Sequence, residues 1–314
     1  MIAEKSIKLA IVIPFYKLTF FETTLESLAN QTDKRFRVYI GDDASPENCS
    51  GLLENYNGKL DFIYYRFETN LGGQSLTKQW ERCIELSNNE EWFMILGDDD
   101  YLGEDVVAKF YNAIATFGDK SNVIRNASVL INEKNEVISK TYYHPINEEA
   151  IDSYCRKLKG DSRSSLSEHI FRMDSYKKYK FKDYKMAWSS DDRAIIDFAD
   201  GKSVFSIDSI VYVRMSDLNI SGGKDNIQEK ISGRLEGTKD LIFDYQSKMS
   251  KAQIKLFIGL YENLIYRYKD FKWNHISYLI YLSIRYFGFN YTNKQIKSLF
   301  FKLIRKNNFV ESSL

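Results

Sequence analysis

Short apolar segments alternate with amphipathic ones through the first 118 residues of the 314-residue chain. Four segments rich in β-branched and aromatic residues predict strands at 8–15, 35–43, 60–67 and 91–96. The intervening segments have helical spacing, which predicts helices over 21–31, 75–86 and 104–118 and a shorter one within 47–56. This order predicts an α/β fold with a mixed, largely parallel, Rossmann-like sheet flanked by helices.

The rest of the chain continues this pattern and then changes to helices. Further strands are predicted in three segments: 121–132, 135–143 and 203–215, the first two as a hairpin or sheet extension. A helix is expected to begin near Ser189 or Ser190, and the chain has helical spacing from Gly222 almost to its end. At the other end of the chain, Thr19 is predicted to cap the helix over 21–31.

Charge is distributed unevenly, although the net charge is only +1. Residues 271–310 contain seven bases, eleven aromatic residues and no Asp or Glu, whereas the other 274 residues have 37 bases and 43 acids. This asymmetry predicts a C-terminal unit with its own partner. We therefore expect a first domain over 1–220, with halves at 1–118 and 119–220, and a helical, basic extension over 221–314.

The basic stretch has the composition of an amphipathic helix that lies on an anionic membrane surface. The alternative is a set of helices packed together with a solvated basic side. Nucleic acid is not an expected partner, because the bases are not interleaved with a known reader motif and the rest of the chain is acidic.

Neither the cysteines nor the N-terminus indicates export. The three cysteines are scattered and form no disulfide framework or CxxC motif, which fits a reducing cytosol. The first apolar run ends at Pro14, which makes it too short for a signal peptide core or a membrane span. We therefore expect a cytoplasmic protein, with the basic stretch able to hold it on the inner face of the cell membrane.

Three predicted strands end in unusual residues. The first ends in Pro14, Phe15 and Tyr16, the second in Asp42 and Asp43, and the fourth in a run of three aspartates, 98–100. In open α/β sheets the ligand lies beyond the carboxyl ends of the strands, so these side chains should face one crevice.

The three adjacent carboxylates of Asp98, Asp99 and Asp100 repel one another and predict a bound cation, although aspartate is also common at helix caps and turns. A calcium loop does not fit, because Leu102 and Lys109 stand where it needs oxygen ligands. Magnesium or manganese held by one or two carboxylates and by substrate phosphates fits better.

Five motifs in this order, IPFY, LESLANQT, VYIGDDAS, NLGG and ILGDDDYL, resemble those of the family 2 glycosyltransferases, which have a GT-A fold. The resemblance covers residues 8–118 clearly and extends weakly to about residue 220. It implies a nucleotide-sugar donor whose base is contacted by Asp43. The other donor-binding residues implied are Pro14, Phe15, Tyr16, Asp42, Asn70, Gly72, Asp98, Asp99 and Arg214.

The resemblance also implies a metal site and a catalytic base. Asp99 and Asp100 match the two aspartates of the family's DxD-type motif, with Asp100 as the main ligand of Mn²⁺ or Mg²⁺. Gly97 stands where many members have Asp, so which two of the three aspartates act stays open. The segment SSDDRAI (189–195) matches the family's base motif, with Asp191 in the Glu position and Asp192 as the general base. Both could also serve as helix caps.

Two further residues receive roles from the motif positions. Arg214 resembles a family position near the donor phosphates, where a basic residue offsets charge. Trp188 offers an aromatic face on which an acceptor sugar stacks well, or it belongs to the core.

The resemblance thus implies a metal-dependent, inverting glycosyltransferase, hexosyltransferase-like, that uses a nucleotide diphosphate sugar with UDP as the expected carrier. Its acceptor would be a hydroxyl of a glycan, expected to be lipid-linked, in surface polysaccharide synthesis. The rival hypothesis is a non-catalytic nucleotide-sugar-binding or scaffold protein with a degenerate site.

Overall fold

The computed structural model describes residues 7–219, 226–268 and 272–297. The chain divides into two compact units, Met1–Asn226 and Ile227–Leu314. The boundary predicted between 220 and 221 falls within residues outside the described ranges and stays a prediction.

The N-terminal half of the first unit is a parallel sheet. Strand β1 (Leu9–Phe15) pairs in parallel with β2 (Phe36–Asp42) on one side and β4 (Trp92–Ile95) on the other, and β2 pairs in parallel with β3 (Phe62–Arg66). The connecting helices are α1 (Phe21–Ala29), α2 (Ser50–Glu54), α3 (Leu76–Ile84) and α4 (Val106–Phe117). Gly118 follows the last of these at φ 51°, which suits glycine at a helix end.

The second half adds strands of both directions. Strand β8 (His169–Arg172) pairs antiparallel with β4 and with β6 (Val123–Ile131), and β6 pairs in parallel with β9 (Val204–Arg214). Two short strands complete the sheet on β9: β5 (Tyr101–Leu102) and β7 (Asn147–Glu148). The described residues therefore form a nine-stranded mixed sheet, which confirms the predicted fold class.

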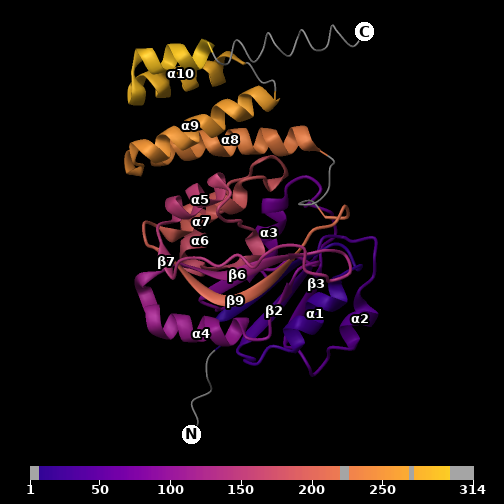
Figure 1. Cartoon of the computed structure of the whole chain (residues 1–314). Helices are drawn as coiled ribbons and strands as arrows, with labels where there is room; N and C mark the ends of the chain where they lie inside the picture. Colours follow the sequence, from indigo (N-terminus) through magenta and orange to yellow (C-terminus); the bar gives the residue numbers. More distant parts are fainter. Residues whose placement is uncertain (1–6, 220–225, 269–271, 298–314) are drawn as a thin grey trace. The chain divides into compact units, whose positions relative to one another are not determined.

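Helices cover both faces of this sheet (Figure 1). One face carries α1, α2 and α4, and its core includes Leu25, Val38 and Phe110, all fully buried. The other face carries α3 together with α5 (Ala150–Lys159), α6 (Met173–Tyr179) and α7 (Ser190–Ala199). An aromatic cluster fills that face: Phe93, Phe171, Tyr176, Phe181 and Phe198. The central strands β1, β2, β4 and β8 are thus buried on both faces, which explains why they are apolar runs, whereas the edge strand β3 is largely exposed.

Two local predictions need correction. Thr19 does not cap α1: the cap position is Phe20, which makes no side-chain cap bond, and the turn closes through Phe21 N donating to Leu18 O at 3.1 Å. Residues 135–143 do not form a strand, because they meet β6 only at the isolated bridges Ile131–Val137 and Ser128–Tyr142.

The second unit is helical, as the spacing predicts. It contains α8 (Ile227–Tyr245), α9 (Lys251–Tyr268) and α10 (Trp273–Phe287), which pack through buried residues such as Ile242, Phe257 and Leu282. Within the described ranges, no helix is both long and apolar enough to cross a membrane. The helical prediction for 269–271 and 298–314 lies outside the described residues.

Candidate active site

The ends of β1, β2 and β4 meet at one edge of the sheet. Asp43 N donates to Phe15 O at 3.0 Å, which joins the ends of β1 and β2. The backbone N–H groups of Tyr16 and Lys17 donate to one carboxylate oxygen of Asp98, at 2.8 and 2.7 Å. Asp98 therefore holds the loop that follows Pro14 and Phe15 against the end of β4. The structure thus brings together the residues that the strand-end pattern predicts as neighbours.

The two aspartates after β2 have different partners. Asp42 is fully buried, and its carboxylate accepts hydrogen bonds from Ser45 N at 2.8 Å, the Tyr64 hydroxyl at 2.6 Å and the Arg66 guanidinium at 2.7 Å. Burial, together with the hydrogen bond to Asp42, raises the pKa of Tyr64, so this hydroxyl stays a donor. Asp42 therefore organises the loop at the end of β2.

Asp43 holds the NLGG turn. Its carboxylate accepts from Leu71 N at 2.7 Å and Gly72 N at 2.9 Å, and it pairs with Arg82 of α3. The Arg82 guanidinium lies 3.8 Å from the centre of the Phe67 ring, which fixes its orientation. Asn70, in the same turn, accepts from Gly73 N at 2.6 Å. Asn70, Gly72 and Asp43 thus form one rigid corner beside the strand ends.

Gly72 offers a test of this corner. A Cβ atom at this position would lie 2.6 Å from Asp43 Oδ2, so Gly72→Ala displaces the carboxylate or the turn. We expect donor affinity to fall by roughly tenfold or more, because misplacement of one hydrogen-bonded charged group costs about 1.5–3 kcal/mol. The measurement is titration calorimetry with UDP. Gly51→Ala is the matched control, since a Cβ there meets no atom within 4 Å. Equal loss of UDP affinity in both variants would contradict the predicted contact of Asp43 with the donor.

Burial dominates the electrostatics of the three aspartates after β4. It raises the pKa of Asp98 to about 7 and that of Asp100 to about 7, and in both cases the charge of Asp99 adds to the effect. The pKa of Asp99 is also raised, again chiefly by burial. Gly97 leaves room for this crowding, because a Cβ at residue 97 would lie 2.8 Å from Asp99 Oδ1. A cation that binds here would offset the mutual repulsion of these adjacent carboxylates, so the site favours cation binding.

Asp99 and Asp100 are held by the end of β9 and the loop after it. Asp100 Oδ1 accepts from Arg214 N at 2.8 Å, and Asp99 Oδ2 accepts from the Asn219 side chain at 2.9 Å. The Arg214 guanidinium donates to Asp99 O at 2.9 Å, Asn132 O at 2.7 Å and Asn135 Oδ1 at 2.6 Å, and the residue is 1% exposed. Arg214 therefore holds Asp99 and Asp100 against the end of β9. Its predicted contact with the donor phosphates stays a prediction.

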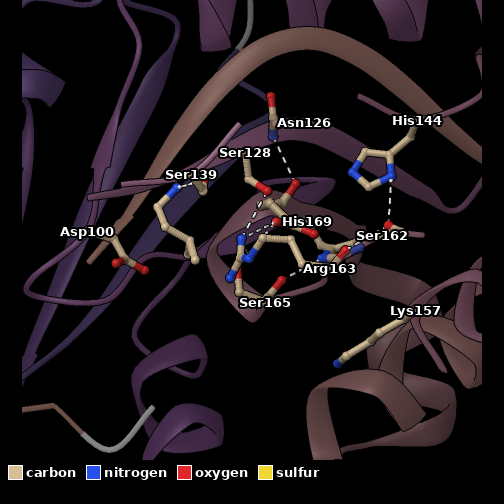
Figure 2. A network of polar contacts seen from close by, with 12 residues as sticks. Asp100, Asn126, Ser128, Ser139, His144, Lys157, Ser162, Arg163, Ser165 and His169 are labelled. Carbon is tan, nitrogen blue, oxygen red and sulfur yellow. Dashed lines mark hydrogen bonds and ion pairs between the residues drawn. The ribbon is translucent and has the colours of Figure 1, made fainter. Parts of the chain in front are cut away.

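A polar network lies beside Asp100 in the second half of the sheet, and Figure 2 shows part of it around Arg163 and Ser128. Ser167 accepts from Gly97 N at 3.2 Å, and its hydroxyl also hydrogen-bonds to Asp100. Next to it, Glu168 pairs with Arg163 at 3.1 Å, and Arg163 donates to Ser128 of β6 at 2.9 Å. In Figure 2, Asp100 lies to the left of this network and Lys157 to its lower right. The network fixes the backbone that carries the aspartates.

Asp99 and Asp100 fit a divalent cation, although they do not enclose one. No group of three or more His, Cys, Asp or Glu side chains in the described part of the chain is placed to hold a metal ion by itself. Magnesium sites that rely on one or two carboxylates take their other ligands from substrate phosphates and water. The adjacent carboxylates of half-buried Asp99 and buried Asp100 meet that requirement, whereas Asp98 already holds the loop after β1.

The predicted base lies at the start of α7. Asp191 and Asp192 are in the first turn, where the helix dipole favours negative charge. Asp192 is buried, and its Oδ1 pairs with Lys157 Nζ of α5 at 2.6 Å. Burial, followed by the Asp192 charge, raises the pKa of Asp191 to about 6. The helix is predicted correctly, but both catalytic roles stay predictions.

The backbone before α7 is strained. Met186, Ala187 and Ser189 all have positive φ, at 57°, 52° and 88°. Such conformations cost of order 1–3 kcal/mol each in residues other than glycine and persist where surrounding structure fixes them, often at functional sites. Trp188 lies half-buried within this turn, so it is near the predicted base, and its acceptor role stays a prediction.

Three residues at the site are absent from the sequence-based prediction. Lys157, Ser167 and Asn219 contact the predicted aspartates across 35, 67 and 120 residues of chain. Neither a shared motif nor a regular sequence spacing links any of these residues to its aspartate partner. The contacts therefore become visible only in the folded structure.

The nine-stranded sheet with helices on both faces has the GT-A fold, as comparison with solved structures shows. S. aureus TarS 1–349, solved in complex with UDP-GlcNAc, matches with a TM-score of 0.63 at 15% identity, over 89% of this chain and 80% of that one. GalNAc-T7, solved with UDP, GalNAc and Mn²⁺, matches with a TM-score of 0.53 at 10% identity, over 76% of this chain and 48% of that one. At these identities the likeness establishes the fold.

The sequence itself gives the family. Residues 10–180, more than half of the chain, match the model of glycosyl transferase family 2, and the chain belongs to this family. A Pasteurella multocida (strain Pm70) chondroitin synthase is 40% identical over 65 residues. This alignment covers 20% of the chain and 7% of that relative.

Proposed function

We propose that the protein transfers a sugar from a nucleoside diphosphate donor, UDP in the first instance, to a glycan hydroxyl with inversion at the anomeric carbon. The observation that carries the proposal is that Asp43, which holds the NLGG turn, lies at the same sheet edge as half-buried Asp99 and buried Asp100. The solved relatives of the same fold contain UDP or UDP-GlcNAc, which supports a nucleotide-sugar donor.

The proposed site residues have three roles: they bind the donor, hold the metal ion and keep both in position. Asp43, with Asn70 and Gly72, binds the base and ribose side of the donor, and Tyr16, 38% exposed, flanks it. Asp99 and Asp100 would hold a manganese or magnesium ion, which when bound offsets the charge of the departing diphosphate. Asp42, Asp98 and Arg214 keep these groups in place through the hydrogen bonds described above.

Asp192 is the base of the proposed reaction. Lys157 contacts Oδ1 of Asp192, which leaves Oδ2 to face the acceptor hydroxyl in this proposal. The hydroxyl proton passes to Asp192 as the oxygen attacks the anomeric carbon and the bond to the diphosphate breaks. Trp188, beside this helix, offers an aromatic face to the acceptor sugar.

A donor screen tests the nucleotide preference. Thermal unfolding is followed with UDP-, GDP-, CDP- and dTDP-sugars, each with and without manganese. The proposal expects one base to stabilise the protein, and to do so more strongly with the metal, since a ligand that binds only the folded state raises its stability. Stabilisation by none of these sugars would contradict a donor site at this sheet edge.

We also propose that the helical unit brings the enzyme to an anionic membrane surface, where a lipid-linked acceptor is found. Exposed apolar residues accompany the bases of the stretch 271–310: Trp273 is 76% exposed and Phe289 67%. Arg285, Lys294 and Lys297 are exposed in the same stretch. Three other bases, at 302, 305 and 306, lie outside the described residues.

Binding to vesicles tests this location. Each base near an anionic surface contributes roughly 1 kcal/mol, and less as salt rises. Co-sedimentation with anionic vesicles at low salt is therefore expected to fall strongly when Arg285, Lys294 and Lys297 become Gln. Replacement of Lys248, Lys251 and Lys255 by Gln removes the same charge elsewhere in the unit and serves as control. If the wild type ignores anionic vesicles at low salt, the basic stretch is only a packing surface.

A further inference from the structure

The ion pair between Lys157 and Asp192 joins two helices that are distant in sequence. Lys157 lies on α5 and Asp192 in the first turn of α7, and Nζ lies 2.6 Å from Oδ1. The side chains are 24% and 10% exposed, so the pair is largely shielded from solvent. An ion pair so shielded has a stronger electrostatic effect than one on the surface, because the effective dielectric constant is lower.

This lysine balances two carboxylates rather than one. Asp191 and Asp192 are adjacent, and the Lys157 charge lowers the pKa of Asp191 against the opposing effects of burial and of Asp192. Two interacting carboxylates take up protons as a unit. Loss of the lysine would therefore remove this effect and raise the pKa of Asp191 further.

The pair also fixes geometry. Lys157 occupies Oδ1 of Asp192 and thereby limits rotation of the carboxylate, so that Oδ2 keeps one direction. The strained turn at 186–189 fixes the start of the same helix from the other side. General bases act efficiently only when held within hydrogen-bond reach of the proton that they remove.

We propose that Lys157 is a positioning residue for the reaction: its ammonium group offsets the charge of the Asp191–Asp192 pair and, by holding Oδ1 of Asp192, directs Oδ2 toward the acceptor hydroxyl. The inference rests on the proposed function. In the step itself, the acceptor proton passes to Asp192 Oδ2, the new bond forms to the anomeric carbon, and the diphosphate leaves with the electron pair. Lys157 stays protonated throughout and exchanges no proton.

The other elements packed against α7 supply few competing charges. From β8, His169 is fully buried, and burial lowers its pKa well below the usual value, so it is neutral. From β6, Arg125 pairs with Glu148. From α6, Lys178 pairs with Asp200 beyond the far end of α7. Lys157 is therefore the cation that pairs with Asp192 among the described residues.

The test compares Lys157→Met with wild type in the rate of transfer across pH. We expect kcat to fall at neutral pH and the acidic limb of the profile to move up by roughly one to three pH units, the usual effect of an opposite charge at this distance. The KM for the donor should change little, and Lys157→Arg should restore most of the rate. Lys159→Met, which removes an exposed lysine from the same helix, is the matched control and should behave as wild type.

A second measurement separates this inference from the proposed function. Carboxyl ¹³C NMR titration of the protein without substrate reports protonation of Asp191 and Asp192, assigned with Asp192→Asn. An upward shift of the midpoints in Lys157→Met supports the electrostatic role even if no sugar is transferred. Unchanged midpoints, or a pH profile that superimposes on that of wild type, would overturn the inference.

Discussion

Replacing Asp192 by asparagine is expected to lower the rate of sugar transfer by roughly 10²- to 10⁴-fold, the usual contribution of a general base. Asparagine keeps the shape of the side chain and an oxygen that can face Lys157, but it cannot accept the acceptor's proton. Donor binding should persist, because no donor-binding residue proposed above lies on α7. The measurement is initial transfer rate together with calorimetric donor affinity.

Asp191→Asn is the companion variant, since it changes the neighbouring carboxylate by the same chemistry. We expect it to retain much more activity than Asp192→Asn. If instead Asp191→Asn is inactive and Asp192→Asn active, the base assignment is wrong by one residue.

Replacing Asp100 by asparagine is expected to lower turnover by roughly 10²- to 10³-fold, the effect of removing one group that stabilises developing charge. The amide oxygen can still accept the hydrogen bond from Arg214 N, which lies 2.8 Å away, so the fold should survive. The charge that would hold a metal ion against the diphosphate is lost. Manganese affinity, measured in the presence of UDP, should fall with the rate.

Asp119→Asn provides the control for Asp100, because it removes one carboxylate that is 87% exposed and paired with Arg172. Its rate and manganese affinity should match wild type. Full activity of Asp100→Asn, or of the wild type in excess chelator, would contradict a metal role for this pair.

The fold was predictable because its central strands are buried on both faces. Apolar runs such as Leu9–Phe15 and Trp92–Ile95 can be identified as strands from the local sequence alone. Their alternation with helices then predicts the α/β fold class. The grouping of Asp42, Asp43 and Asp98 at one edge follows equally from the rule for strand ends. The cap at Thr19 was not predictable in this way, because a backbone turn closed by Leu18 competes with any side-chain cap.

The partners of the aspartates depend on tertiary packing. Lys157 reaches Asp192 only because α5 packs beside α7, and Asn219 reaches Asp99 only because β9 ends next to β4's aspartates. No periodicity links residues that meet across separate elements. The sequence therefore located the carboxylates, and the structure shows that Asp42 and Asp98 hold loops. The ligand roles of Asp99, Asp100 and Asp192 are proposals.

The most direct test of the account is release of nucleoside diphosphate from a UDP-sugar by the purified protein with manganese, compared with Asp100→Asn under the same conditions. The account predicts slow hydrolysis without acceptor, faster release with a glycan acceptor, and neither in the variant. Binding of the UDP-sugar with no release under any of these conditions would contradict it and would identify the protein as a non-catalytic nucleotide-sugar-binding member of the family.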